Sequence, residues 1–278
     1  MGGESLAVAD ENSLDISKPG GRTAAMRGGM LRDLVGIYWF PFLLTLGLMV
    51  ACYAASLHRE VITQNGQVIR RSTPTLGLFL GGIAVATVVT PGVVLAEESW
   101  FGRVVAWAGV VDAIMFVWLA PVIAGVVSFW DWGEAVCVAV AYTVALVGVA
   151  SGLRGIRSPS VLAAGVTVVV GVAWLAWPVW MAPWLTGENR EATVGWLVWG
   201  HPVFALNGAM LEAFGQPWAQ MTVAYRLTNL GDDIAYEMPR GVWACVGVHG
   251  VIAGLVIVPQ VFLFGRGKKR LVEVRDGG

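Results

Sequence analysis

Charged side chains are scarce in this sequence: they make up 13% of its 278 residues, against 56% for hydrophobic residues. A soluble globular domain carries about twice that share of charge. The net charge is −1, so the overall balance gives no attraction to nucleic acid. These shortages argue against an ordinary soluble domain and against a nucleic-acid-binding protein. They predict a chain whose main partner is the lipid bilayer.

The sequence also lacks the motifs of common catalytic sites. It contains no phosphate-binding loop, HExxH, GxSxG or dinucleotide-binding motif. We therefore expect no intrinsic enzymatic activity, no metal and no cofactor, and any ATP hydrolysis to be carried out by another subunit. There is no internal repeat that would favour a secondary transporter built from inverted repeats. The three cysteines form no CxxC pair and each lies within an apolar stretch, as small buried hydrophobic residues do.

The sequence contains six long apolar runs. Each is about long enough to cross a hydrocarbon core of about 30 Å as a helix. The runs are Leu34–Leu57, Thr75–Ala96, Val104–Trp130, Ala135–Leu153, Val161–Leu185 and Val242–Phe264. The predicted fold is therefore an all-α polytopic membrane protein with six transmembrane helices.

The distribution of basic residues predicts the orientation of these helices. Lysine and arginine near the ends of transmembrane helices favour the cytoplasmic side. If both termini are cytoplasmic, twelve of the 18 basic residues lie inside, although the first outer loop, His58–Pro74, is an exception with three arginines. The acidic connection Asp131–Glu134 is then outside. Most tryptophans fall near the outer boundary, as in an interfacial belt, although an aromatic ligand cage is the alternative. We expect a multi-pass protein of the inner, cytoplasmic membrane.

Three segments follow from this pattern. Residues 1–33 are predicted to be a flexible cytoplasmic tail with an amphipathic segment at Arg22–Asp33, residues 34–264 the six-helix domain, and residues 265–278 a basic cytoplasmic tail. Residues 186–241 form the longest loop, on the outer side. Within it, an apolar stretch is interrupted at Gly200, His201 and Pro202, and neither of its two pieces is long enough to cross a bilayer. This pattern predicts a re-entrant or surface-lying helical hairpin, followed by a more polar cap.

Several polar residues are candidate functional groups. Asp112 is the only carboxylate well inside a run, and it is a candidate for a proton relay or gate, or else a packing residue. His249 lies within the last run, where it is a candidate for proton transfer or haem ligation, or else a helix-packing residue beside Gly247 and Gly250. The cap carries oxygen ligands that could gather a hard cation or simply form a solvated acidic turn, namely Asn229, Asp232, Asp233 and Glu237.

The architecture resembles the membrane subunit, or permease, of ATP-binding-cassette exporters. Glu97 and Glu98 followed by Gly102 are similar to the start of that family's cytoplasmic coupling element, and the string from His201 to Phe204 is similar to one after its fifth span. The inner loop after the second run is short for a coupling helix. The resemblance implies a homodimer or heterodimer that moves substrate with a separate ATPase subunit. The alternatives are a non-transporting membrane scaffold or assembly factor and a membrane protein that handles haem or electrons.

Overall fold

The computed structural model describes residues 19–57, 72–156, 158–181, 191–214, 239 and 241–276, and the regular structure in these ranges is all helical. Five helices are long and apolar enough to cross a membrane, which agrees with a multi-pass membrane protein. A sixth apolar helix, α5, is shorter. The helices are α1 (Pro19–Leu57), α2 (Ser72–Ala96), α3 (Trp100–Ile123), α4 (Phe129–Gly155), α5 (Ser160–Leu175), α6 (Trp177–Trp180), α8 (Glu191–Gly200), α9 (Pro202–Phe214) and α11 (Trp243–Asp276).

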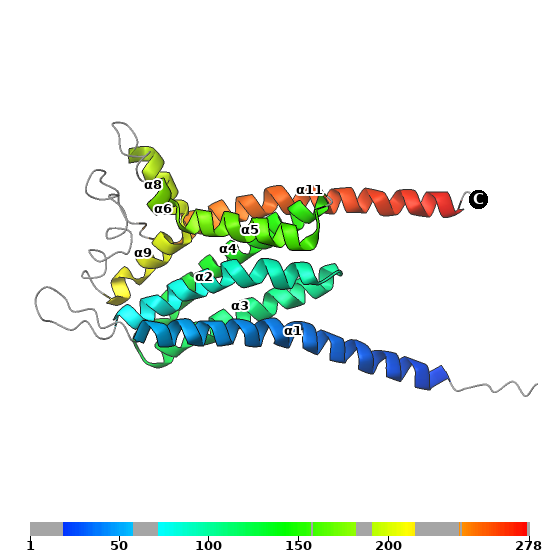
Figure 1. The fold of residues 1–278 in the computed structure, drawn as a ribbon, viewed down its shortest axis with the longest axis horizontal. Coiled ribbons are helices and arrows are strands. Elements are labelled where there is room, and N and C mark those ends of the chain that lie inside the picture. Colours follow the sequence, from blue (N-terminus) through cyan, green and yellow to red (C-terminus); the bar gives the residue numbers. More distant parts are fainter. Residues whose placement is uncertain are drawn as a thin grey trace, which may run out of the picture.

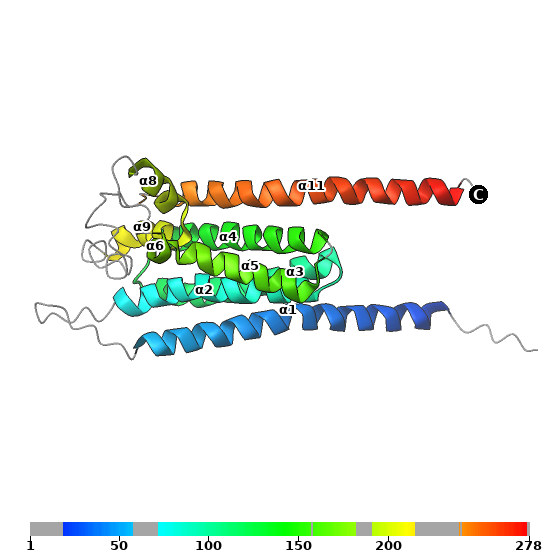
Figure 2. The ribbon, with the colours of Figure 1, turned by 45° about the horizontal axis from the view of Figure 1, so that its top comes forward.

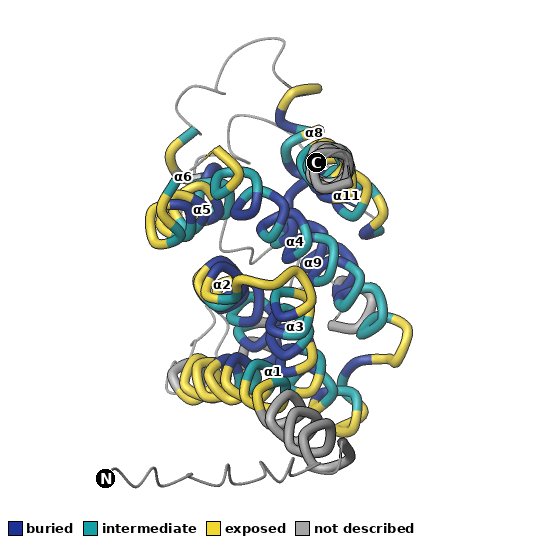
Figure 3. Tube along the Cα trace, turned by 90° about the vertical axis from the view of Figure 1, so that its right-hand side faces the viewer, coloured by how far each residue is buried: buried dark blue, intermediate teal, exposed yellow. Residues whose placement is uncertain are grey.

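The long helices run side by side in one bundle (Figures 1 and 2). Helix α2 contacts α1, α3, α4 and α5, whereas α1 and α11 lie on opposite edges (Figure 3). The first turns of α1 and the last turns of α11 extend past the bundle at the same end, and helical structure therefore continues into both predicted tails. Helices α8 and α9 lie at the opposite end.

Aromatic side chains and interhelical hydrogen bonds hold the centre of the bundle together. Trp118 of α3 is fully buried, and its indole N–H donates to the Leu78 carbonyl of α2 at 3.2 Å. Gly82 leaves room for this indole, because a Cβ there would lie 2.6 Å from the ring. The hydroxyls of Thr87 and Tyr142 join α2 to α4 at 2.8 Å. In hydrocarbon such bonds satisfy groups that have no water to bond.

The predicted boundary between the third and fourth runs is wrong. Helix α3 ends at Ile123, and Gly125 follows with φ +67, a left-handed conformation that glycine adopts readily at a helix end. The Ser128 hydroxyl then accepts a hydrogen bond from the Asp131 N–H and caps α4. The residues from Asp131 to Glu134 therefore lie within the first two turns of α4, and the connection is 124–128.

The fifth predicted run, Val161–Leu185, does not form one continuous helix. Helix α5 ends at Leu175, and the short α6 follows after Ala176. Pro178 explains the break, because a proline has no N–H to give to the carbonyl four residues earlier and its ring crowds that carbonyl, here that of Trp174. Residues 182–190 lie outside the described part of the chain.

The interruption predicted at Gly200, His201 and Pro202 separates two short helices, α8 and α9. Helix α9 packs against α4 and α2, and α8 packs against α11. The predicted cation ligands Asn229, Asp232, Asp233 and Glu237 lie outside the described residues, as does most of the predicted cap.

Candidate functional site

The residues selected from the sequence fall in three separate places. Glu97, Glu98 and Gly102 lie at the connection between α2 and α3, at the same end as Pro19 and Asp276. Asp112 lies on α3 near the middle of its span, and His201 and His249 come together toward the other end.

Two arginines shape the connection between α2 and α3. Arg154, in the last turn of α4, donates to the carbonyls of Leu95 and Glu97 at 3.2 and 3.1 Å. Arg103 donates to the carbonyls of Glu97 and Glu98 at 3.0 and 3.4 Å. The Leu95 carbonyl lies in the last turn of α2, where the helix dipole is negative and no intrahelical donor remains, and the carbonyls of Glu97 and Glu98 follow directly after the helix. The arginines therefore fix the backbone of this corner and leave both glutamate carboxylates without an ion pair to these two guanidinium groups.

A side-chain cap and a closely packed glycine form the start of α3. The Ser99 hydroxyl accepts from the Gly102 N–H at 2.9 Å and caps the helix. A Cβ on Gly102 would lie 2.8 Å from both a Glu97 carboxylate oxygen and the Ser99 hydroxyl, so a larger residue would shift these two side chains. We call residues 97–102 with Arg103 and Arg154 the α2–α3 corner.

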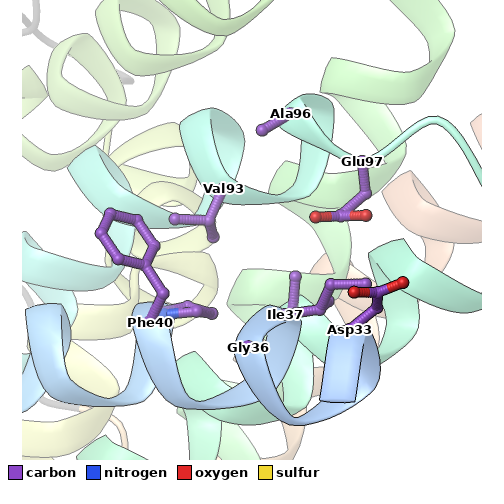
Figure 4. A pocket seen from close by; sticks show the side chains of 9 residues that line it. Asp33, Gly36, Ile37, Phe40, Val93, Ala96 and Glu97 are labelled. Atoms are coloured by element: carbon purple, nitrogen blue, oxygen red, sulfur yellow. The ribbon is translucent and has the colours of Figure 1, made fainter. Parts of the chain in front are cut away.

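A crevice of about 480 Å³ opens beside this corner, between α1, α2 and α3 (Figure 4). The carboxylates of Asp33 and Glu97 lie at one end of it and the Phe40 ring at the other, with apolar residues such as Ile37 and Val93 between them. The crevice is thus acidic where it meets the corner and apolar deeper along the helices.

Asp112 is exposed on the outside of the bundle, on α3. The Tyr38 hydroxyl of α1 donates to its carboxylate at 2.8 Å. A charged aspartate at the centre of a transmembrane helix costs about 2.5–3.5 kcal/mol on insertion scales. The sequence identified Asp112, but Tyr38 is 74 residues away along the chain and only the packing of α1 on α3 brings them together.

The third place is a buried cluster formed where two helix breaks meet. Pro178 frees the Trp174 carbonyl at the end of α5, and His201, at the break between α8 and α9, bonds that carbonyl through Nε2 at 3.1 Å. The His201 ring also packs against the rings of Trp174, Trp177 and Phe204, with centroids 5.6, 6.0 and 5.1 Å away. His201 therefore acts as a cap for α5 supplied by another part of the chain.

His249 joins this cluster from α11. Its ring lies 6.4 Å from that of Trp174 and 5.3 Å from that of Tyr142, and its Nδ1 bonds the Cys245 carbonyl at 2.8 Å. A carbonyl only accepts, so the bonded nitrogen of each histidine carries the hydrogen. Within the described residues no group of three histidine, cysteine, aspartate or glutamate side chains could hold a metal ion. Each histidine ring packs against aromatic side chains and bonds a backbone carbonyl through one nitrogen.

Burial lowers the pKa of His201 to about 3, and its hydrogen bonds to the carbonyls of Trp174 and Leu175 offset only part of this effect. The unfolded imidazole binds a proton near pH 6.5, whereas the folded one stays neutral until the pH approaches 3. The contribution of His201 to stability is therefore complete above pH 6.5 and is lost as the pH falls through this window.

We expect the free energy of unfolding to fall with pH below 6.5 by an amount due to His201 that approaches about 1.4 kcal/mol per pH unit. Chemical denaturation in detergent micelles between pH 7.5 and 4.5 measures this slope. His201→Gln, which keeps a donor but does not titrate, should flatten the slope. Equal slopes for the two proteins would contradict the prediction.

No family model matches this chain, and neither a curated protein nor a solved structure matches it. Sequence reasoning missed the roles of Arg103, Arg154 and Trp174. Pro178, four residues after Trp174, was the available signal that this carbonyl needs a donor from elsewhere.

Proposed function

We propose that this chain is the membrane subunit of an export system of the ATP-binding-cassette type, working with a separate ATPase. The observation that carries the proposal is the α2–α3 corner, whose backbone is fixed by Arg103 and Arg154 and which presents an exposed Glu98 beside the half-buried Glu97. A rigid corner at a bundle end with an exposed carboxylate is suited to transmitting movement from a protein with a complementary basic groove. In the proposal, this corner takes the place of a longer coupling helix.

The arrangement of the termini supports six crossings with both ends in the cytoplasm. Pro19 and Asp276 lie at the same end of the bundle, which requires an even number of crossings. The sixth crossing would be α5, whose 16 residues extend about 24 Å. Together with α6 the apolar segment reaches Trp180. The excess of basic residues at the end of the bundle where the two termini lie favours the cytoplasmic side for that end.

The short helices at the other end support the same reading. Helices α8 and α9 meet at His201 and are secured to the end of α5 by its bond to the Trp174 carbonyl. The exporter permeases that the sequence resembles carry a helical hairpin outside their fifth span, and the pair of α8 and α9 would occupy that place. In the proposal these helices form an extracytoplasmic hairpin that closes the outer end of the substrate path, formed with a second membrane subunit.

Site-specific photo-crosslinking in native membranes tests the proposal. A benzophenone amino acid at Trp100, which is 60% exposed and two residues from Glu98, should crosslink to an ATPase with a phosphate-binding loop, identified by mass spectrometry. Glu98→Lys in the same chain should reduce the yield, because it replaces the exposed carboxylate of the corner by a cation. The same probe at Trp130, 73% exposed at the start of α4, is the matched control and should give no such product.

Two outcomes would overturn this function. Crosslinking of the ATPase at Trp130 but not at Trp100 would place the corner on the outer side. A membrane protein without ATPase activity as the only product at Trp100 would favour the alternative of a non-transporting scaffold.

A further inference from the structure

The position of Asp112 is unusual for a membrane helix. It lies twelve residues after Trp100, the first residue of α3, or about 18 Å along the helix, and is exposed on the outside of the bundle. Ionisable groups inside a membrane usually face the interior of a bundle or a water-filled path. Asp112 instead lies on the outer surface of the bundle, where lipid or another protein would contact it.

The surface around Asp112 is aromatic and apolar. Phe116, one turn later on α3, is 63% exposed, and Trp39 on α1 is 48% exposed. Phe42 stacks on the Tyr38 ring with centroids 6.0 Å apart and lies 6.5 Å from Phe116. We call this surface, formed by α1 and α3 around Tyr38 and Asp112, the Asp112 seam. Its exposed aromatic and apolar side chains are suited to packing against lipid or against another helix. The Asp112 carboxylate is the exception.

Among the described spans, no basic side chain lies at the depth of Asp112. The only lysines or arginines in the five long apolar spans are Arg103 and Arg154, and both bond backbone carbonyls at the α2–α3 corner. Arg103 precedes Asp112 by nine residues, about 13.5 Å along the same helix. The Tyr38 hydroxyl supplies one hydrogen bond to the carboxylate but no charge.

A second copy of the chain does not supply the charge either. A two-fold axis along the membrane normal keeps each residue at the same depth in both copies. At the depth of Asp112 the spans carry no basic residue, so pairing two seams would bring two carboxylates together. The complementary partner therefore differs in sequence from this chain.

We propose that the Asp112 seam binds a transmembrane helix of another membrane protein, and that this helix carries a lysine or arginine at the depth of Asp112. The Tyr38 hydroxyl holds the carboxylate toward that cation, and the neighbouring aromatic rings pack against the apolar face of the partner helix. This proposal does not depend on the ATPase partner, because the seam lies within the membrane and the α2–α3 corner lies at its edge.

Synthetic transmembrane peptides test the proposal. The full chain, labelled with a donor fluorophore, is reconstituted in vesicles with acceptor-labelled leucine-rich helices that carry a central lysine, a central leucine, or a lysine moved one heptad toward one end. We expect the central-lysine peptide to associate about tenfold more tightly than the central-leucine peptide, the scale of a polar contact between membrane helices. The peptide with the displaced lysine should bind less tightly than the central-lysine peptide.

Variants of the chain make the result specific. Asp112→Asn should remove the advantage of the central-lysine peptide, and Tyr38→Phe should reduce it, whereas Glu134→Gln, a matched carboxylate change at the start of α4, should leave it intact. Thermal unfolding in detergent should show that Asp112→Asn remains folded. Equal binding of the central-lysine and central-leucine peptides to the wild-type chain would overturn the proposal. So would energy transfer between two copies of the chain that is lost in Asp112→Asn, which would show self-association at the seam.

Discussion

Replacing Gly109 by leucine should destabilise the bundle by about 3 kcal/mol or more, because α1 and α3 touch at this residue. A Cβ on Gly109 would lie 2.5 Å from the Tyr38 carbonyl oxygen and 3.4 Å from the Phe42 nitrogen, both backbone atoms of α1. Backbone cannot rotate away as a side chain can, so the two helices must separate. The midpoint of thermal unfolding in detergent measures the loss.

Gly92→Leu is the matched control for this experiment. Gly92 lies on the exposed face of α2, and a Cβ there meets no atom within 4 Å. The same substitution should therefore change the unfolding midpoint little. An equally stable Gly109→Leu protein would show that α1 does not pack on α3 at Tyr38, and the bond between Tyr38 and Asp112 would then be in doubt as well.

Replacing His201 by alanine should cost about 3 kcal/mol of stability, and the loss should be centred on the end of the bundle formed by α5, α8 and α9. The substitution leaves the Trp174 carbonyl without its donor and creates a cavity among the rings of Trp174, Trp177 and Phe204. Hydrogen exchange followed by mass spectrometry should show faster exchange in α5 and α8, with α1 and α3 unchanged.

His201→Gln distinguishes the two causes of this loss. Its amide can still donate to the Trp174 carbonyl but does not fill the space of an imidazole, so it should recover part of the stability that alanine loses. If alanine and glutamine are equally damaging, ring packing rather than the hydrogen bond stabilises this end. If neither changes exchange in α5, His201 does not cap that helix.

The membrane character of the chain was predictable from its sequence. Apolar runs about 20 residues long have few alternatives, because a backbone in hydrocarbon must satisfy its own hydrogen bonds. Prolines and glycines also marked most of the irregular points: Pro178 ends α5 early, Gly125 ends α3, and the break at His201 falls where the sequence placed it. Hydropathy alone missed the first two boundaries because the residues beyond them are apolar as well.

The sequence by itself determined that the chain is helical and suited to a membrane. It identified Asp112 and His249 as polar groups within apolar runs, His201 as part of a helix break, and Glu97 through a family resemblance. Only the tertiary structure decided what each of them bonds. The partners lie far along the chain: Tyr38 for Asp112, Trp174 for His201, and Arg154 for the Glu97 carbonyl. Helix packing brings such groups together through close contacts at small residues such as Gly109, and hydropathy carries no information about which faces of two helices will meet.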